Sequence, residues 1–131
     1  GFDYIVPHTI VDNPKAKEVY VSTMIIIAEQ LKTLDDMGIP REDSANLLPL
    51  GMTTKMVCKM NFRTLMTMSH QRKCTRAYWE FRELFADIEN ALREYSEEWK
   101  YLVDTYCIPK CELYGYCPES DSCGMYPQKG E

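Results

Sequence analysis

Two arginines stand at opposite ends of one expected helix, and their types and spacing suit the binding of an anion. Arg63 falls in the first turn after Asn61, whose side chain can cap a helix, and Arg72 falls near the helix end. A helix N-terminus presents free backbone N–H groups and a positive dipole end, which favour a phosphate or another anion. The alternative, which the residue types alone favour, is that both arginines form ion pairs with acidic residues of the next helix, namely Glu80, Glu83 and Asp87.

Six cysteines form a second group with chemical potential. Cys58 and Cys74 lie in periodic segments and are expected to be small buried apolar residues. The other four gather near the end of the chain and are candidate zinc ligands, namely Cys107, Cys111, Cys117 and Cys123. Four thiolates can hold a tetrahedral zinc, although the close Cys-x-x-Cys pairs typical of zinc sites are missing. Free thiols and disulfides therefore remain open alternatives.

Several classes of function find no support in the sequence. It has no Gly-rich phosphate loop and no metalloprotease helix, and its two histidines, His8 and His70, are each more typical of packing or surface positions. The net charge of −5 argues against a general nucleic-acid binder. The longest apolar run, residues 24–28, is too short to cross a bilayer. We expect a cytoplasmic protein that binds neither nucleic acid nor membranes.

The first element that must position these residues is a long amphipathic helix. Asn13 followed by Pro14 is a strong helix start, and Gly38 and Pro40 predict its end. Apolar residues recur at steps of four and three along one face, namely Tyr20, Met24, Ile27, Leu31 and Leu34. This stripe favours core packing over an oligomer interface.

Shorter elements follow. A second helix is expected from residue 40 and should stop before Pro49, and alternation over residues 52–60 predicts a half-buried strand. Asn61 should cap the helix that carries both arginines, and Thr75 should cap a last helix that runs to about Thr105. The expected buried face of that last helix is Ala77, Phe81, Leu84, Ile88, Ala91 and Tyr95. Residues 107–131 are expected to form an irregular tail, and the predicted class is helix-rich α+β.

Ordered along the chain, these segments resemble the flavin-dependent thymidylate synthases. Residues 42–49 read Glu-Asp-Ser-Ala-Asn-Leu-Leu-Pro, residues 54–55 Thr-Lys, residues 61–63 Asn-Phe-Arg and residues 76–82 Arg-Ala-Tyr-Trp-Glu-Phe-Arg. The family reads roughly Glu-Asp-Ala-Arg-x-x-Leu-Pro, Thr-Lys, Asn-Ala-Arg and Arg-Ala-Gln-Trp-Glu-Ile-Arg in the same order and at matching spacing. The similarity covers almost the whole chain and includes the cysteine-bearing tail.

The resemblance implies the C-terminal part of that family's fold, with long helices packed on a small sheet. Residues 1–106 would form the catalytic part and residues 107–131 a tail. The implied activity is FAD-dependent methylation of dUMP to dTMP by a homotetramer, with NADPH and methylenetetrahydrofolate as co-substrates. By position, Asn61, Phe62, Arg63 and Thr67 would contribute to the flavin site. Arg72 would be the catalytic residue, meeting the uracil ring of the substrate.

The departures from the family pattern keep other functions open. The family's Arg-His-Arg segment would precede Phe2, so we expect the chain to be part of a longer protein that begins before Gly1. Ala45 stands where an arginine usually meets the dUMP phosphate, Thr67 replaces an asparagine, and Tyr78 replaces a glutamine. A degenerate relative that binds a nucleotide or a protein partner without catalysis is one alternative. A small interaction module built on a zinc-binding tail is another.

Overall fold

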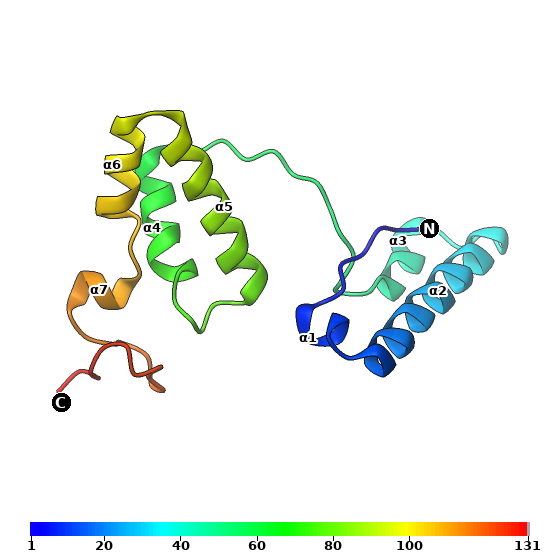
Figure 1. The fold of residues 1–131 in the computed structure, drawn as a ribbon. Coiled ribbons are helices and arrows are strands. Elements are labelled where there is room, and N and C mark those ends of the chain that lie inside the picture. Colours follow the sequence, from blue (N-terminus) through cyan, green and yellow to red (C-terminus); the bar gives the residue numbers. More distant parts are fainter. Residues whose placement is uncertain (131) are drawn as a thin grey trace. The chain divides into compact units, whose positions relative to one another are not determined.

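The computed structural model describes residues 1–130, which form two compact units, one covering Gly1–Val57 and one beginning at Cys58. The first unit contains α1 (His8–Val11), α2 (Pro14–Asp36), α3 (Arg41–Ser44) and the single 3-10 turn η1 (Ala45–Leu47). The second contains α4 (Phe62–Arg72), α5 (Trp79–Tyr95), α6 (Glu97–Tyr106) and α7 (Lys110–Tyr114) (Figure 1). The predicted helix-rich class is therefore confirmed.

The long helix α2 begins and ends as its sequence predicts. The Asn13 side chain accepts a hydrogen bond from the backbone N–H of Ala16 at 3.2 Å, and Pro14 occupies the first helical position. After the helix, Gly38 adopts the left-handed conformation with φ 76°. The five residues of the predicted stripe are buried or half-buried, with Met24 the most enclosed. The stripe is thus the more enclosed side of the helix, as the sequence predicts.

The N-terminal segment of the first unit lies against the loop that follows η1. Tyr4 forms an isolated antiparallel bridge with Met52, and the N–H of Ile5 donates to the carbonyl of Gly51 at 3.0 Å. The hydroxyl of Tyr20 on α2 donates to the carbonyl of Ile5, also at 3.0 Å. A Cβ at Gly51 would clash with that hydroxyl, so any larger residue here would displace the Tyr20 side chain from this hydrogen bond.

The predicted strand over residues 52–60 is wrong, and so is the small sheet. Apart from the single bridge at Met52, this segment has no regular structure, and Val57 is fully exposed. The boundary between the two units falls within it, after residue 57. A strand needs a neighbour to accept its backbone hydrogen bonds, and the described residues supply none beyond this bridge.

The core of the second unit lies between α4, α5 and α6. Leu65 of α4, Phe85 of α5, Val103 of α6 and Cys107 just after α6 are its buried members. The chain passes from α5 to α6 at Ser96, whose extended backbone breaks the helix and whose hydroxyl accepts from the N–H of Trp99 at 3.1 Å. Ser96 thus acts as an N-cap.

The single last helix predicted to run from Thr75 to about Thr105 is therefore wrong in its start and in its continuity, while its predicted end lies within one residue of the end of α6 at Tyr106. Residues 73–78 form a turn, α5 begins only at Trp79, and α5 and α6 are separate helices that pack against each other. The predicted buried face is also displaced. Leu84 is 49% exposed and Tyr95 is 78% exposed, whereas Phe85 is buried. Ile88 is the member of the predicted set that packs against the core.

The C-terminal segment is more regular than predicted. It contains α7, which ends at Gly115 in the left-handed conformation with φ 76°. Beyond it, the N–H of Cys117 donates to the carbonyl of Pro127 at 2.6 Å, so the chain folds back on itself. This segment belongs to the second compact unit. The division into a catalytic domain ending at residue 106 and a separate tail remains a prediction.

Candidate functional site

The N-terminus of α4 has the arrangement expected of an anion site. The Asn61 side-chain oxygen accepts from the backbone N–H and the hydroxyl of Thr64, at 2.9 and 3.0 Å. This cap fixes the start of the helix, and the first-turn N–H groups of Phe62 and Arg63 have no intrahelical acceptor. The Arg63 side chain is exposed beside them. A positive dipole end and a guanidinium thus lie together.

Thr67 and Phe62 both have contacts within the second unit. The Thr67 hydroxyl donates to the carbonyl of Arg63 one turn earlier, at 3.0 Å, so its proton is engaged by the helix itself. Phe62 packs against the core of the second unit, with its ring edge-to-face with Trp99 and Tyr106 at centroid distances of 5.7 and 6.3 Å. Phe62 therefore anchors α4, while Arg63 points outward next to it.

Arg72, at the other end of α4, is held by an aromatic ring. Its guanidinium carbon lies 4.1 Å from the ring centroid of Phe81 on α5, a cation–π contact. Within the part of the chain that the structure describes, neither Arg72 nor Arg63 forms an ion pair with Glu80, Glu83 or Asp87, so the structural alternative raised by the sequence is not realised. Stacking occupies one face of the guanidinium and leaves its in-plane N–H donors available.

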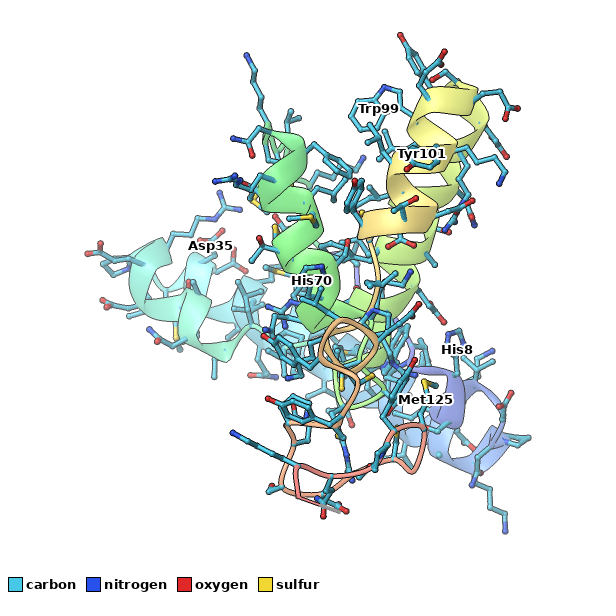
Figure 2. The ribbon with its side chains drawn as sticks, turned by 90° about the vertical axis from the view of Figure 1, so that its left-hand side faces the viewer. His8, Asp35, His70, Trp99, Tyr101 and Met125 are labelled. Atoms are coloured by element: carbon cyan, nitrogen blue, oxygen red, sulfur yellow. The ribbon has the colours of Figure 1, made fainter. Side chains whose placement is uncertain are left out.

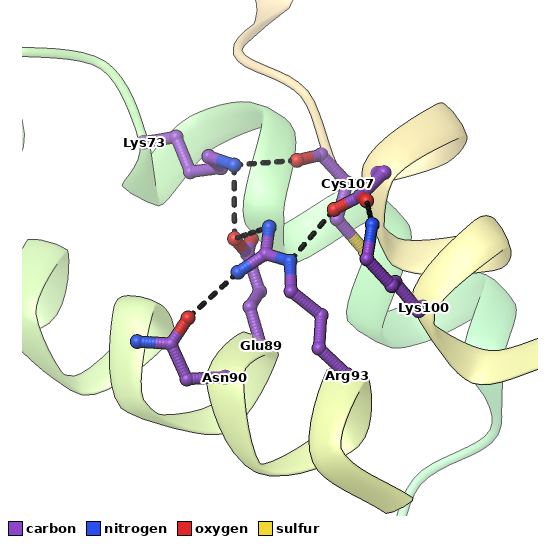
Figure 3. A network of polar contacts seen from close by, with 7 residues as sticks. Lys73, Glu89, Asn90, Arg93, Lys100 and Cys107 are labelled. Atoms are coloured by element: carbon purple, nitrogen blue, oxygen red, sulfur yellow. Dashed lines mark hydrogen bonds and ion pairs between the residues drawn. The ribbon is translucent and has the colours of Figure 1, made fainter. Parts of the chain in front are cut away.

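An ionic network around the buried Glu89 supports the same end of α4 (Figure 3). Lys73, next to Arg72, donates to the Glu89 carboxylate at 2.9 Å and to the Cys107 carbonyl at 2.7 Å. Glu89 is only 2% exposed, and Arg93 lies 3.5 Å from the same carboxylate oxygen. The sequence analysis missed Glu89. The one available signal was its place one turn after the apolar Phe85, which puts it on the inward face.

His70 also serves the framework. Its Nε2 lies 3.1 Å from the carbonyl of Tyr106, so it links α4 to the end of α6. Figure 2 shows His70 on α4 and the aromatic residues Trp99 and Tyr101 on α6. This is the packing role that the sequence favoured for a lone histidine.

The described residues do not bring the four candidate cysteines together as a metal site. Cys107 is buried in the hydrophobic core with Val103 and Leu65, and its burial raises the pKa of its thiol. Among residues 1–130, no group of three or more histidine, cysteine or acidic residues is arranged to hold a metal ion. The reason is the apolar sequence context of Cys107, at the end of the inward face of α6. Cys111, Cys117 and Cys123 instead share a cavity with Cys74, which the sequence analysis placed in the core.

The first unit carries a cavity that sequence reasoning did not find. It has a volume of about 610 Å³ and lies between α2, α3 and the N-terminal residues. Arg41 and Ala45, one helical turn apart, both line it, together with Lys32, Glu29 and Asp35. Ala45, the position where the family pattern has an arginine, therefore faces open space. The wall of this cavity is formed by residues that lie far apart in the sequence, so no local sequence pattern could reveal the cavity.

Comparison with known proteins gives a family match and several relatives. Residues 2–96 match the family model described as thymidylate synthase complementing protein, a range that contains all of α4. The chain is 30% identical over 136 residues to the flavin-dependent thymidylate synthase of Nitratidesulfovibrio vulgaris, an alignment covering 96% of this chain and 54% of that relative. It is 32% identical over 125 residues to the enzyme of the same name from Geobacter sulfurreducens, covering 95% of this chain and 52% of that relative. No solved structure is significantly similar to the chain.

The chain spans about half the length of the curated relatives it matches. None of the helices in residues 1–130 is both long enough and apolar enough to pass through a membrane. The extent of the family match, well over half of the chain, settles its relationship. The chain belongs to the thymidylate synthase complementing protein family, whose curated relatives are named flavin-dependent thymidylate synthases.

Proposed function

We propose that this chain contributes the α4 portion of an active site that methylates dUMP to dTMP. FAD would be the cofactor, with NADPH and methylenetetrahydrofolate as co-substrates. The names of the relatives support the reaction class. The assembly we propose is a homotetramer in the cytoplasm. Bound FAD would supply the reductive chemistry, and the residues described here would bind and orient the reactants.

The observation that carries this proposal is the state of Arg72. Its guanidinium is stacked on Phe81 at 4.1 Å and has no carboxylate partner in the described part of the chain. Its planar guanidinium presents in-plane donors to a planar acceptor. Arg72 is therefore suited to donate hydrogen bonds to the carbonyl edge of a uracil ring and to stabilise negative charge that develops there.

Arg63 and the start of α4 would hold an anionic part of the flavin cofactor. Two first-turn N–H groups, the helix dipole and the exposed guanidinium act on the same region. Asn61 would contribute mainly by capping, because its side-chain oxygen is already engaged by Thr64. Thr67 would line the same exposed face one turn further on, and Phe62 would contribute through the core contacts that fix the helix.

A non-catalytic relative that retains a nucleotide is the second candidate. Two observations favour it. Ala45 lines the cavity of the first unit, and it supplies no positive charge where the family pattern has an arginine. The Thr67 hydroxyl donates to the Arg63 carbonyl of its own helix, α4. Such a protein would bind flavin or nucleotide and would not turn over.

The test uses the protein encoded by the whole gene, incubated with FAD, desalted, and scanned for the visible absorbance of bound flavin. Arg63→Ala should weaken flavin binding about 10- to 100-fold, because one charge-assisted hydrogen bond contributes about 1.5–3 kcal/mol. Arg72→Ala should retain flavin and lose dUMP-dependent turnover. Lys17→Ala, which removes an exposed cation on α2, is the matched control for both. Absence of flavin binding by the unsubstituted protein would refute the synthase reading, and flavin binding without turnover would select the second candidate.

A further inference from the structure

The last residue of α4 and the first turn of α5 meet in one side-chain contact. The guanidinium carbon of Arg72 lies 4.1 Å from the ring centroid of Phe81. Arg72 ends α4, and Phe81 lies in the first turn of α5, which begins at Trp79. Both residues belong to the second unit. The turn between the two helices, residues 73–78, therefore brings a half-buried arginine against an aromatic ring.

The backbone on both sides of this contact is fixed by other residues. Lys73, directly after Arg72, donates to the carboxylate of the buried Glu89 at 2.9 Å (Figure 3). On α5, Phe85 lies one turn after Phe81 and is only 2% exposed in the core of the second unit. The two helices are thus held together without the contact, and what the contact determines is the direction of the Arg72 side chain.

Phe81 stands outside the core of the second unit. Its side chain is 39% exposed, and the described residues that form this core or pack against it do not include Phe81. A long arginine side chain has many accessible rotamers, and most of them are lost when it binds a ligand. A ring that already holds the guanidinium by one face removes part of this loss before the ligand arrives.

We propose that Phe81 is a positioning residue, whose ring holds the Arg72 guanidinium so that its N–H donors face the carbonyl edge of a bound uracil. Stacking on the ring covers one face of the guanidinium and leaves the donors in its plane available. Phe81 acts through Arg72 and touches no reactant itself. This inference rests on the proposed function, because uracil is the ligand that the proposed reaction requires.

The experiment measures the affinity for dUMP by isothermal titration calorimetry, with FAD present and with the protein encoded by the whole gene. Phe81→Leu removes the π face and keeps an apolar side chain, whereas Phe81→Tyr keeps the face. Tyr95→Leu is the matched control, because Tyr95 is another exposed aromatic residue of α5, at the other end of that helix. Far-UV circular dichroism of each variant checks that the helices are retained.

We expect Phe81→Leu to weaken dUMP binding about 3- to 10-fold, which is the effect of losing a partly exposed cation–π contact. Phe81→Tyr and Tyr95→Leu should bind dUMP as the unsubstituted protein does. Arg72→Ala should weaken binding more than Phe81→Leu does. Adding Phe81→Leu to Arg72→Ala should cause no further loss, because the ring then has no guanidinium to orient. A ring that served only packing would still cause a loss in that background.

Equal dUMP affinity of Phe81→Leu and the unsubstituted protein would overturn the proposal, as would equal weakening by Phe81→Leu and Phe81→Tyr. A further loss in the double variant would overturn it too, because Phe81 would then act other than through Arg72. Absence of dUMP binding by the unsubstituted protein would refute the proposed function and this inference with it. Since the readout is binding, a protein that binds dUMP without methylating it should show the same pattern, so the inference and the reaction are tested separately.

Discussion

The buried ion pair between Lys73 and Glu89 gives the sharpest test of how α4 is held in place. We predict that Lys73→Met destabilises the second unit, while the double variant Lys73→Met/Glu89→Met recovers most of the loss. Breaking one half of a buried pair leaves an unpaired buried charge, whereas replacing both halves by apolar residues of similar size is often neutral.

The expected magnitude follows from the contacts. Removing one partner of a buried pair costs about 3–5 kcal/mol. Two features reduce that cost here, because the Lys73 side chain is 29% exposed and Arg93 remains 3.5 Å from the carboxylate. The hydrogen bond from Lys73 to the Cys107 carbonyl is lost as well and adds about 1 kcal/mol. We therefore expect a loss of about 2–3 kcal/mol for the single variant and about 1 kcal/mol for the double variant.

The assay is urea unfolding followed by tryptophan fluorescence. Both tryptophans, Trp79 and Trp99, belong to the second unit, so the signal reports that unit alone. Lys100→Met is the matched control, because it removes an exposed lysine from the Asp104 pair on α6 and should cost less stability than Lys73→Met.

Two results would refute this reasoning. The first is a double variant that is no more stable than Lys73→Met. That result would mean that the pair contributes more to stability than the mutual neutralisation of its two charges. A loss no larger than that of Lys100→Met would mean that Glu89 is solvated in solution and that the network in Figure 3 does not fix α4.

Three further predictions concern other contacts. The Lys100 hydrogen bond, with help from Arg93, lowers the pKa of Asp104, so its contribution is complete above the unfolded value of about 3.8 and is lost as pH falls through the lower folded value. Urea unfolding of Asp104→Asn at several pH values should therefore show a deficit at pH 6 that disappears at strongly acid pH. Ser96→Ala should cost about 1 kcal/mol in the same assay by removing the cap of α6, whereas Ser96→Asp should retain stability. Gly51→Ala should speed hydrogen exchange of the Ile5 amide, because its Cβ would clash with the Tyr20 hydroxyl, and combination with Tyr20→Phe should partly reverse the effect.

The parts of the fold predicted correctly are those set by local interactions. Asn13 and Asn61 cap helices through hydrogen bonds to residues three positions later, so a few neighbouring residues determine each start. The stripe along α2 repeats over many turns, and its periodicity identifies the buried face.

The errors arise where distant partners decide the structure. Thr75 has the chemistry of a cap, but the turn that contains it is held to the C-terminal segment by Arg76, which donates to the Asp121 carbonyl, and α5 begins only at Trp79. Residues 52–60 alternate as a strand does, yet alternation alone supplies no partner for the backbone. Ser96 was hidden inside a continuous apolar repeat, although serine is a preferred N-cap residue and two glutamates follow it.

The candidate site shows the same division between local and distant causes. The sequence placed Arg63 and Arg72 at the two ends of one helix because helix length follows from local pattern. It gave no indication of what holds Arg72, since Phe81 lies on the next helix and was assigned to the core. The family pattern has isoleucine at that position, and an aliphatic side chain has no π face to attract a cation. The aromatic residue therefore gives this chain a means of holding Arg72 that does not use a carboxylate, so the donors of the guanidinium stay available to a ligand.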